Sequence, residues 1–243
     1  MIDIHNHVLP GMDDGPADMG EALAIAKLAV ADGVTHLMAT PHIHPGLYDN
    51  TLEGIALALK SFRDAVAEAG IPLAVSAAAE MRFDLEVMTR VDTGTLPYLG
   101  HWKSQSVFLL EFPHTEVPFG AERLVEWLVA RDICPMIVHP ERNRDILNEP
   151  QRLAPFLQQG CLLQVTASAL TGQFGERTRG MAEQLVRDGA VTCLASDAHN
   201  TVNRLPCLSQ GARAVEALAG RAAARALTHE NPWQIVKGHF EAA

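Results

Sequence analysis

Two pairs of potential metal ligands lie near opposite ends of the chain with the same spacing. His5 and His7 are separated by one residue, and so are Asp197 and His199. Alternate residues of a β-strand point to the same face, so each pair presents two side chains together. A lone histidine is more often structural, but a repeated same-face pair favours metal binding. Asp3 shares the face of His5, where it can accept a hydrogen bond from a ligating imidazole or form a buried salt bridge.

Other histidines and carboxylates follow separate apolar segments. These candidates are Asp14, His42, Glu80, Glu111 and His139. An acidic side chain at the inner end of a strand is unfavourable unless a cation neutralises it, so Glu80 and Glu111 require a positive partner. The Asp-Asp-Gly sequence at 13–15 is also a common turn, which leaves Asp13 as an alternative to Asp14.

The nine candidates supply five histidines and four carboxylates, without a thiolate. Nitrogen and oxygen donors favour Mn, Fe, Zn or Mg over a structural zinc cluster. Three divalent ions would bring six positive charges against the four carboxylates, and the resulting excess of positive charge attracts phosphate.

Two arginines closely follow candidate ligands. Arg142 lies three residues after His139, and Arg204 lies five residues after His199. Taken singly, either arginine could form a surface salt bridge, for example with a nearby acidic residue such as Glu141 or Asp145. Together, beside metal ions, they are expected to bind a phosphate group.

Short apolar segments must position these side chains. Seven are expected to be strands, at residues 2–8, 34–39, 71–78, 106–110, 133–138, 161–165 and 191–195. Helical spacing separates most of them, and four of the intervening segments end in a glycine suited to a helix C-terminus: Gly33, Gly70, Gly160 and Gly189. This alternation predicts parallel strands closed into a barrel, with an open doubly wound sheet as the alternative. In either architecture, side chains at the carboxyl ends of the strands converge.

Composition restricts the possible functions. The 243 residues, 48% of them hydrophobic, are expected to form a single domain, 1–243, because no linker or charge block divides them. The apolar segments are too short to span a bilayer, and a signal sequence is not evident, so a cytoplasmic protein without membrane insertion is expected. The net charge of −10 argues against nucleic acid as a partner. The four cysteines lack Cys-x-x-Cys spacing and are expected to form no disulfide.

Taken in order, these motifs resemble a known family. They are Asp-Ile-His-Asn-His at 3–7, Asp-Asp-Gly at 13–15, Ala-Thr-Pro-His at 39–42, Glu80, Glu-Phe-Pro at 111–113, His-Pro-Glu-Arg at 139–142 and Ser-Asp-Ala-His-Asn at 196–200. The set resembles the polymerase-and-histidinol-phosphatase (PHP) superfamily. More narrowly, it is similar to bacterial manganese-dependent protein tyrosine phosphatases of capsule and exopolysaccharide operons. The resemblance covers residues 2 to about 205.

This resemblance implies a distorted seven-stranded (β/α) TIM-like barrel with three divalent ions, preferably Mn²⁺, with Fe, Zn or Mg as alternatives. The implied ligands are His5, His7, Glu80 and Asp197 for the first ion, Glu80, Glu111 and His139 for the second, and Asp14, His42 and His199 for the third. Arg142 and Arg204 would bind the phosphoryl group. Many superfamily members have histidine at the positions of Asp14 and Glu111, so these carboxylates favour the tyrosine phosphatase branch.

The implied reaction uses a water that bridges two ions, loses a proton and attacks phosphorus in line with the leaving oxygen. A phenolate leaves readily because its conjugate acid has a pKa of about 10. Asp197 and a metal-bound water are both candidates for a general acid. The implied substrate is the tyrosine-rich tail of a bacterial tyrosine autokinase, which would make the protein a regulator of polysaccharide synthesis. Tyr48, Trp102 and Phe119 are candidate aromatic residues at the rim that contacts this tail.

Four alternatives differ in chemistry. Cys207 and Arg213 have the Cys-x5-Arg spacing of cysteine-based tyrosine phosphatases, but Cys207 precedes a segment with helical spacing, so the match is interpreted as accidental. Histidinol-phosphate phosphatase activity would use the same metal site on a small substrate. A metal-dependent nuclease is disfavoured by the negative charge, and a non-catalytic metal-binding domain is disfavoured by the complete ligand set.

Overall fold

The computed structural model describes residues 1–241, in which strands alternate with helices. The strands are β1 (Ile2–Asn6), β2 (His36–Ala39), β3 (His42–Ile43), β4 (Ala74–Ala77), β5 (Glu80–Arg82), β6 (Gly100–Trp102), β7 (Gln105–Glu111), β8 (Ile133–Val138), β9 (Leu162–Thr166) and β10 (Cys193–Ala195). The α-helices are α1 (Met19–Ala31), α2 (Leu52–Glu68), α3 (Glu86–Asp92), α4 (Ala121–Val129), α5 (Arg144–Asn148), α6 (Ala154–Gln158), α7 (Glu176–Arg187), α8 (Ser209–Ala219), α9 (Arg221–Arg225) and α10 (Asn231–Val236). A π-helical turn, Ala226–Glu230, joins α9 to α10.

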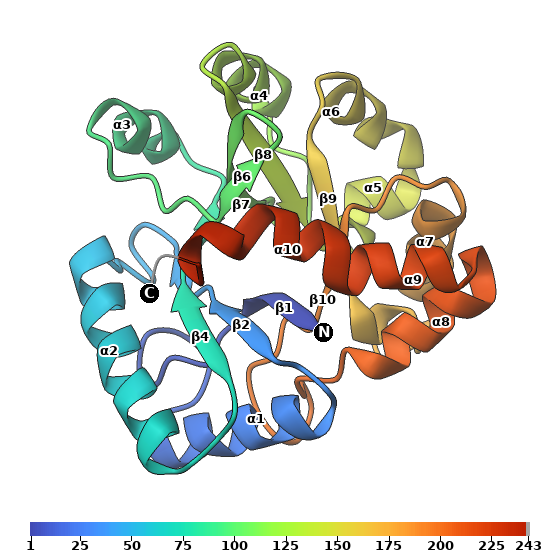
Figure 1. Cartoon of the computed structure of the whole chain (residues 1–243). Coiled ribbons are helices and arrows are strands. Elements are labelled where there is room, and N and C mark those ends of the chain that lie inside the picture. Colours follow the sequence, from blue (N-terminus) through green and yellow to red (C-terminus); the bar gives the residue numbers. More distant parts are fainter. Residues whose placement is uncertain (242–243) are drawn as a thin grey trace.

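All seven predicted strand segments contain a strand, and the expected parallel α/β class is confirmed. The strands form two sheets, in the order β1-β2-β4 and β10-β9-β8-β7-β5-β3, and β6 pairs with β7. Every pairing is parallel except the hairpin of β6 and β7. The helices lie around the outside of the strands (Figure 1).

Within residues 1–241, the sheets do not form one continuous closed barrel. The chain leaves β2 at Thr40 and Pro41 and leaves β4 at Ala78 and Ala79, and the next short strands, β3 and β5, pair in the other sheet. Proline lacks the amide hydrogen that a continuous ladder would require, which accounts for one of these breaks. The sequence pattern predicted seven strand segments but missed three short strands, which are β6 and the two beyond the breaks.

The edge strands β1 and β10 belong to different sheets, and backbone hydrogen bonds connect β1 to the residues just beyond the end of β10. The amide of Asp197 donates to the carbonyl of His5 at 2.8 Å, and the amide of His7 donates to the carbonyl of Ala198 at 2.8 Å. Backbone hydrogen bonds therefore hold the two ligand pairs of the sequence against each other.

Four helices end where glycine was predicted to end them. Gly33, Gly70, Gly160 and Gly189 have φ values of 95°, 63°, 88° and 66°. These values lie in the left-handed region, which glycine adopts without a steric penalty. Each glycine follows the C-cap residue of its helix.

The two faces of the longer strands contribute to different apolar cores. Phe108, Leu110, Ile137 and Leu163 belong to the core that includes the surrounding helices. The alternate side chains form a second core, which includes Val107, Leu109, Cys134, Met136, Val138, Cys193 and Ala195 together with Ile235 and Val236 of α10. The last helical region, which carried no recognisable motif, therefore completes the inner core.

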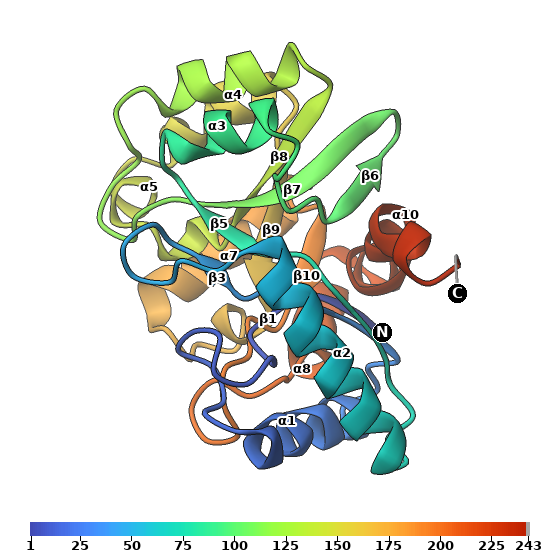
Figure 2. The ribbon, with the colours of Figure 1, turned by 90° about the vertical axis from the view of Figure 1, so that its left-hand side faces the viewer.

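Helix α10 lies across the strands in Figure 1, and Figure 2 shows it beside β6 at one end of the molecule. The contact is close because Gly100 of β6 has φ +146°, and a Cβ added there would lie 2.0 Å from the carbonyl oxygen of Ile235. Among residues 1–241, no helix is both long and apolar enough to cross a membrane.

Candidate metal centre

Seven of the nine candidate ligands lie near the carboxyl end of a strand or in the loop that follows it, and His42 and Glu80 begin the short strands β3 and β5 that come after β2 and β4. His5 is in β1, His42 in β3 and Glu80 in β5, and Glu111 is the last residue of β7. The others follow strands: His7 and Asp14 come after β1, His139 after β8, and Asp197 and His199 after β10. All are buried except His42, which is partly exposed, and Asp14, which is exposed.

One group of donor atoms surrounds Nε2 of His5 and His7, which lie 3.4 Å apart. Oε2 of Glu80 is 3.3 Å from each of these nitrogens. Oδ1 of Asp197 is 3.5 Å from His5 and 3.4 Å from His7. These four side chains are the set implied for the first ion.

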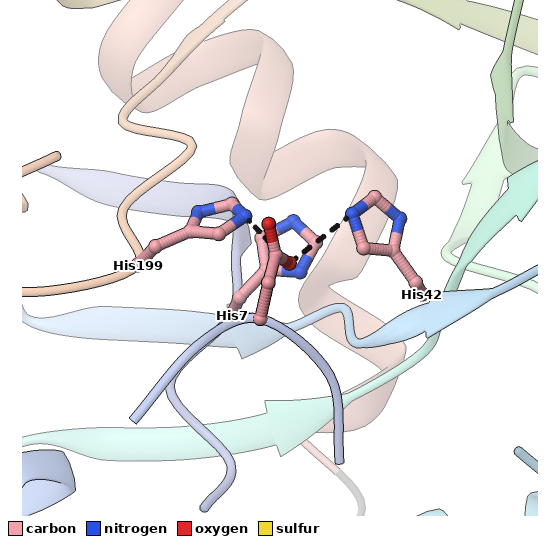
Figure 3. Close-up of side chains that lie close together, drawn as sticks. His7, His42 and His199 are labelled. Atoms are coloured by element: carbon pink, nitrogen blue, oxygen red, sulfur yellow. Dashed lines mark ion pairs between the residues drawn. The ribbon is translucent and has the colours of Figure 1, made fainter. Parts of the chain in front are cut away.

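A second group forms at the outer side of the site. His7, His42 and His199 converge in Figure 3, and they lie with Asp14 so that one donor atom of each falls within 4.8 Å of the others. Oδ1 of Asp14 is 3.5 Å from Nε2 of His42 and 3.2 Å from Nε2 of His199. The set implied for the third ion is therefore brought together, with His7 beside it.

The third group departs in part from the implied set. His42, Glu80 and Glu111 have donor atoms within 4.8 Å of one another. His139, the expected companion of the two glutamates, reaches Oε1 of Glu80 with its Nε2 at 2.9 Å. The two oxygens of Glu80 thus face different histidines, an arrangement suited to a carboxylate that bridges two ions.

The backbone is strained at two of these positions. His139 has φ 34° and Asp197 has φ 52°, values that residues with a side chain rarely adopt. Such conformations persist only where the surrounding structure enforces them, and they concentrate at functional sites. His139 directly follows β8, and Asp197 lies two residues beyond the end of β10, and both strands belong to the second sheet.

Two residues that the sequence analysis did not assign orient the first histidines. Nδ1 of His5 is 2.8 Å from Oε1 of the buried Gln164, and Nδ1 of His7 is 2.6 Å from Oδ2 of Asp13. A ring that donates from Nδ1 presents the lone pair of Nε2 to the site. Asp13 and Asp14 therefore have separate roles, since Asp14 faces His42 and His199.

Asp3 has neither of the two roles considered for it, a hydrogen bond from a ligating ring or a buried salt bridge. Its carboxylate accepts hydrogen bonds from the Ser196 hydroxyl at 2.6 Å and the Ser196 amide at 3.0 Å, and it does not contact the ring of His5. Asp3 instead fixes the backbone that leads to Asp197, because Gln164 on β9 already occupies the ring nitrogen of His5.

Both predicted phosphate-binding arginines converge on one carboxylate. Nη1 of Arg142 donates to Oδ2 of Asp197, and Nη2 of Arg204 lies 2.6 Å from the same oxygen. Neither arginine pairs with Asp145, which pairs with Arg152, but Nη1 of Arg204 also lies 3.8 Å from Oδ2 of the exposed Asp14. The guanidinium group of Arg142 also lies 4.8 Å from the ring centre of Phe174.

The electrostatics leave several ligands in the form that binds a cation. Burial and the charge of Arg142 lower the pKa of His139 to about 3. Burial and the charge of His7 lower the pKa of His199 to about 4. Burial would raise the pKa of Glu80, but the charges of His5 and His42 hold it well below its usual value. At neutral pH, His139 and His199 are therefore neutral and Glu80 is ionised.

The donor atoms fit divalent ions. Within the part of the chain that the structure describes, His42 Nδ1, Glu80 Oε2, Asp197 Oδ1 and His199 Nε2 are buried without a hydrogen-bond partner. Buried polar atoms are seldom left unsatisfied, and opposed lone pairs repel unless a cation lies between them. Ligands bound at about 2.1 Å to one ion lie roughly 3 Å from each other, close to the separations in the first group.

The Cys-x5-Arg match does not form a phosphate-binding loop. The Asp32 carboxylate accepts hydrogen bonds from the amides of Leu208 and Ser209 at 2.6 and 2.8 Å. Burial raises the pKa of the Cys207 thiol, whereas a nucleophilic cysteine needs a lowered pKa. The segment is the beginning of α8, as its helical spacing predicted.

The three expected rim aromatics occupy different places. Tyr48 stacks on His42, with ring centres 5.6 Å apart and planes 9° apart. Phe119 is fully exposed in the loop between β7 and α4. Trp102 was misplaced, because it lies in β6 and pairs with Gln105 at the start of β7, the end of that strand opposite the site.

Comparisons with known proteins point in one direction. The sequence model of a family described as "Capsular polysaccharide synthesis, CpsB/CapC" matches residues 1–237. The chain is 36% identical over 204 residues to the tyrosine-protein phosphatase YwqE of Bacillus subtilis, covering 84% of this chain and 79% of YwqE. It is 26% identical over 243 residues to the tyrosine-protein phosphatase CpsB of Streptococcus pneumoniae, covering 97% and 98% of the two chains.

A solved structure supports the same relationship. It comes from work on YwqE and CpsB as metal-dependent tyrosine phosphatases and superimposes with a TM-score of 0.91 at 32% identity, covering 98% of this chain and 94% of that one. A histidinol phosphate phosphatase from Lactococcus lactis superimposes with a TM-score of 0.55 at 12% identity, covering 90% of this chain and 93% of that one. The second likeness shows a shared fold alone.

Proposed function

The chain belongs to the CpsB/CapC family of capsular polysaccharide synthesis, and on this basis we propose that it is a metal-dependent protein tyrosine phosphatase. The observation that carries the proposal is the buried set of opposed imidazole and carboxylate donors beside two arginines. Structural zinc sites use closed thiolate-rich sets, whereas a nitrogen and oxygen site beside arginines suits phosphoryl transfer.

The ligand roles are proposed as the sequence implied them. His5, His7, Glu80 and Asp197 would hold one ion, Glu80, Glu111 and His139 a second, and Asp14, His42 and His199 a third. The distances in the third group also allow His42 to serve beside Glu80 and Glu111. When bound, the ions would make a water more acidic and neutralise phosphoryl oxygens. We propose Mn²⁺ as the preferred ion because the motifs resemble those of manganese-dependent phosphatases, and the imidazole and carboxylate donors without sulfur suit Mn²⁺, as they also suit Fe, Zn or Mg.

Arg142 and Arg204 would hold the non-bridging oxygens of the phosphoryl group. Both guanidinium groups approach Asp197 Oδ2 from separate loops, so they are already directed to one point beside the ligands. Burial would raise the pKa of Asp197, but the charges of His5, Arg142 and Arg204 hold it well below its usual value. Asp197 is thus ionised at neutral pH, and its proposed role is to orient the arginines and bind metal rather than to donate a proton.

The proposed substrate is phosphotyrosine on the tail of a bacterial tyrosine autokinase, and the proposed setting is regulation of polysaccharide synthesis in the cytoplasm. Family membership supports this assignment. A tyrosine side chain carries its phosphate at the end of a rigid ring, and it leaves as a phenolate with a conjugate-acid pKa of about 10, so catalysis needs little help from a proton donor.

The test compares a phosphotyrosyl peptide with histidinol phosphate, using Mn²⁺-loaded protein and the same protein after chelation. We expect the peptide to be hydrolysed with the higher kcat/KM and the activity to disappear on metal removal and return on reloading. A preference for histidinol phosphate would reassign the protein to small-molecule metabolism. Activity that persists after verified metal removal would contradict the metal-dependent mechanism.

A further inference from the structure

A third arginine lies at the mouth of the site and has no part in the mechanism described above. Arg82 is the last residue of β5, two residues beyond Glu80, so both side chains leave the strand on the same face. Nη1 of Arg82 lies 3.0 Å from Oε2 of Glu111, and 21% of the Arg82 side chain is exposed. Arg82 therefore reaches from the metal ligands to the solvent at the opening.

Arg82 is separated from the two arginines that face Asp197. In the sheet order β10-β9-β8-β7-β5-β3, Arg142 and Arg204 follow β8 and β10, whereas Arg82 ends β5 on the other side of β7. For residues 1–241, Glu111 is the one carboxylate within ion-pair distance of Arg82. A guanidinium group has five N–H donors, so most of those on Arg82 remain available at the opening.

Within residues 1–241, the carboxylate that opposes the charge of Arg82 is that of Glu111, which is itself a candidate metal ligand. The nearest acidic residue in sequence, Asp84, accepts a hydrogen bond from the amide of Glu86 at 2.8 Å.

We propose that Arg82 binds a carboxylate of the peptide beside the phosphotyrosine, so that the enzyme prefers substrates with an acidic neighbour. This inference rests on the phosphatase function proposed above. The planar guanidinium group matches a carboxylate in a two-point hydrogen bond. The chain carries a net charge of −10, so its general surface repels acidic peptides. An acidic residue of the substrate is therefore expected to bind where Arg82 supplies positive charge at the opening.

The experiment uses pairs of phosphotyrosyl peptides that differ by Glu or Gln at one position directly before or after the phosphotyrosine. For the metal-loaded wild type, we expect the Glu peptide of at least one pair to have a kcat/KM about two- to fivefold higher, as for a partly exposed ion pair. Arg82→Gln should bring this ratio to one, and Arg82→Lys should retain part of it. Arg90→Gln, which removes the same charge from α3, should leave the ratio unchanged.

The ratio separates substrate recognition from a structural role. If Arg82 merely holds Glu111 in place, Arg82→Gln will lower the turnover of both peptides and of phenyl phosphate by one common factor, and the inference is overturned. Equal turnover of all Glu and Gln pairs by the wild type overturns it as well, while the phosphatase function stands. If the metal-loaded wild type hydrolyses no phosphotyrosyl peptide, the proposed function fails, and this inference fails with it.

Discussion

The two ends of the strands are built from opposite chemistry. On β7, Leu109 packs in the inner core, and Glu111, two residues further, belongs to the candidate metal centre. Ala195, the last residue of β10, packs in the same core, and Asp197, two residues further along the chain, faces the histidines. One step of two residues along a strand thus separates apolar packing from ionic ligands. Stability and chemistry are divided along the strand axis, so substitutions at the two ends should affect different measurements.

The largest expected effect is on activity, at the ligand end. Glu80→Ala removes the carboxylate that faces His5, His7, His42 and His139. We expect kcat/KM for a phosphotyrosyl peptide to fall by at least about a thousandfold, because Glu80 is positioned to bridge two ions. The melting temperature of the metal-free protein should change little. A variant that retains its bound metal and most of its activity would contradict the assignment of activity to the ligand end of the strands.

The opposite end should show the reverse effect. Gly100→Ala places a Cβ 2.0 Å from the carbonyl oxygen of Ile235 and forces α10 away from β6. We expect the free energy of unfolding to fall by about 2–4 kcal/mol, measured by denaturant titration, with kcat at low temperature unchanged.

Gly94→Ala is the matched control for Gly100→Ala. Gly94 has φ +69° and no heavy atom within 4 Å of an added Cβ. This variant should therefore show only the roughly 1 kcal/mol penalty of a left-handed backbone. If Gly94→Ala is as destabilising as Gly100→Ala, the close contact with α10 does not explain the loss of stability in Gly100→Ala.

A buried acid near the site gives a pH-dependent test of moderate size. Burial raises the pKa of Glu141 from 4.5 to about 7, against the hydrogen bond from the Thr166 amide. The folded state then binds a proton more tightly than the unfolded state. The contribution of Glu141 to stability is therefore most favourable below pH 4.5 and declines as the pH rises to 7.

Glu141→Gln should remove this dependence. In metal-free protein, we expect the stability of the variant relative to the wild type to rise by up to about 3 kcal/mol between pH 4.5 and pH 8. Denaturant titrations at several pH values measure the difference. Parallel stability curves for the two proteins would show that Glu141 is ionised throughout.

The smallest expected effect is that of Cys207→Ser, far from the ligands in the fold. The thiol lies 3.9 Å from Oδ1 of Asp32 and makes no contact with the candidate metal centre. We expect kcat/KM to change by less than about twofold and stability by less than about 1 kcal/mol. An inactive variant with normal fold and metal content would indicate that Cys207, rather than the metal centre, carries out catalysis.

The sequence predicted what depends on local patterns. Strand alternation and helix-ending glycines identified seven of the ten strands in residues 1–241 and four helix ends, because both are determined within a few residues. The division into two sheets depends on where β3 and β5 pair after the breaks near Pro41 and Ala79, which periodicity does not reveal. The packing of α10 under the inner core likewise depends on contacts between distant segments.

The candidate site was predicted more completely than its surroundings. The ligand motifs are unusual combinations of residues and could be assigned by resemblance. Gln164 and Arg82 were missed, and Asp13 was considered only as an alternative ligand to Asp14, because a glutamine in a strand, an aspartate in a turn and an arginine at a strand end are common features. Their importance comes from the partner that each meets across the fold, and one sequence without its relatives carries no signal for that.

The shared carboxylate of Asp197 has a thermodynamic consequence. Its Oδ1 faces the histidines, and its Oδ2 faces Arg142 and Arg204, so the proposed cation site and the proposed anion site would use two atoms of one rigid group. A change at one oxygen alters the charge available at the other. Linkage then requires reciprocity: the factor by which metal loading changes the affinity for phosphate is the factor by which phosphate changes the affinity for metal. Bound metal ions add positive charge beside the phosphate position, so we expect this factor to exceed one, and bound phosphate would then also strengthen the binding of the metal.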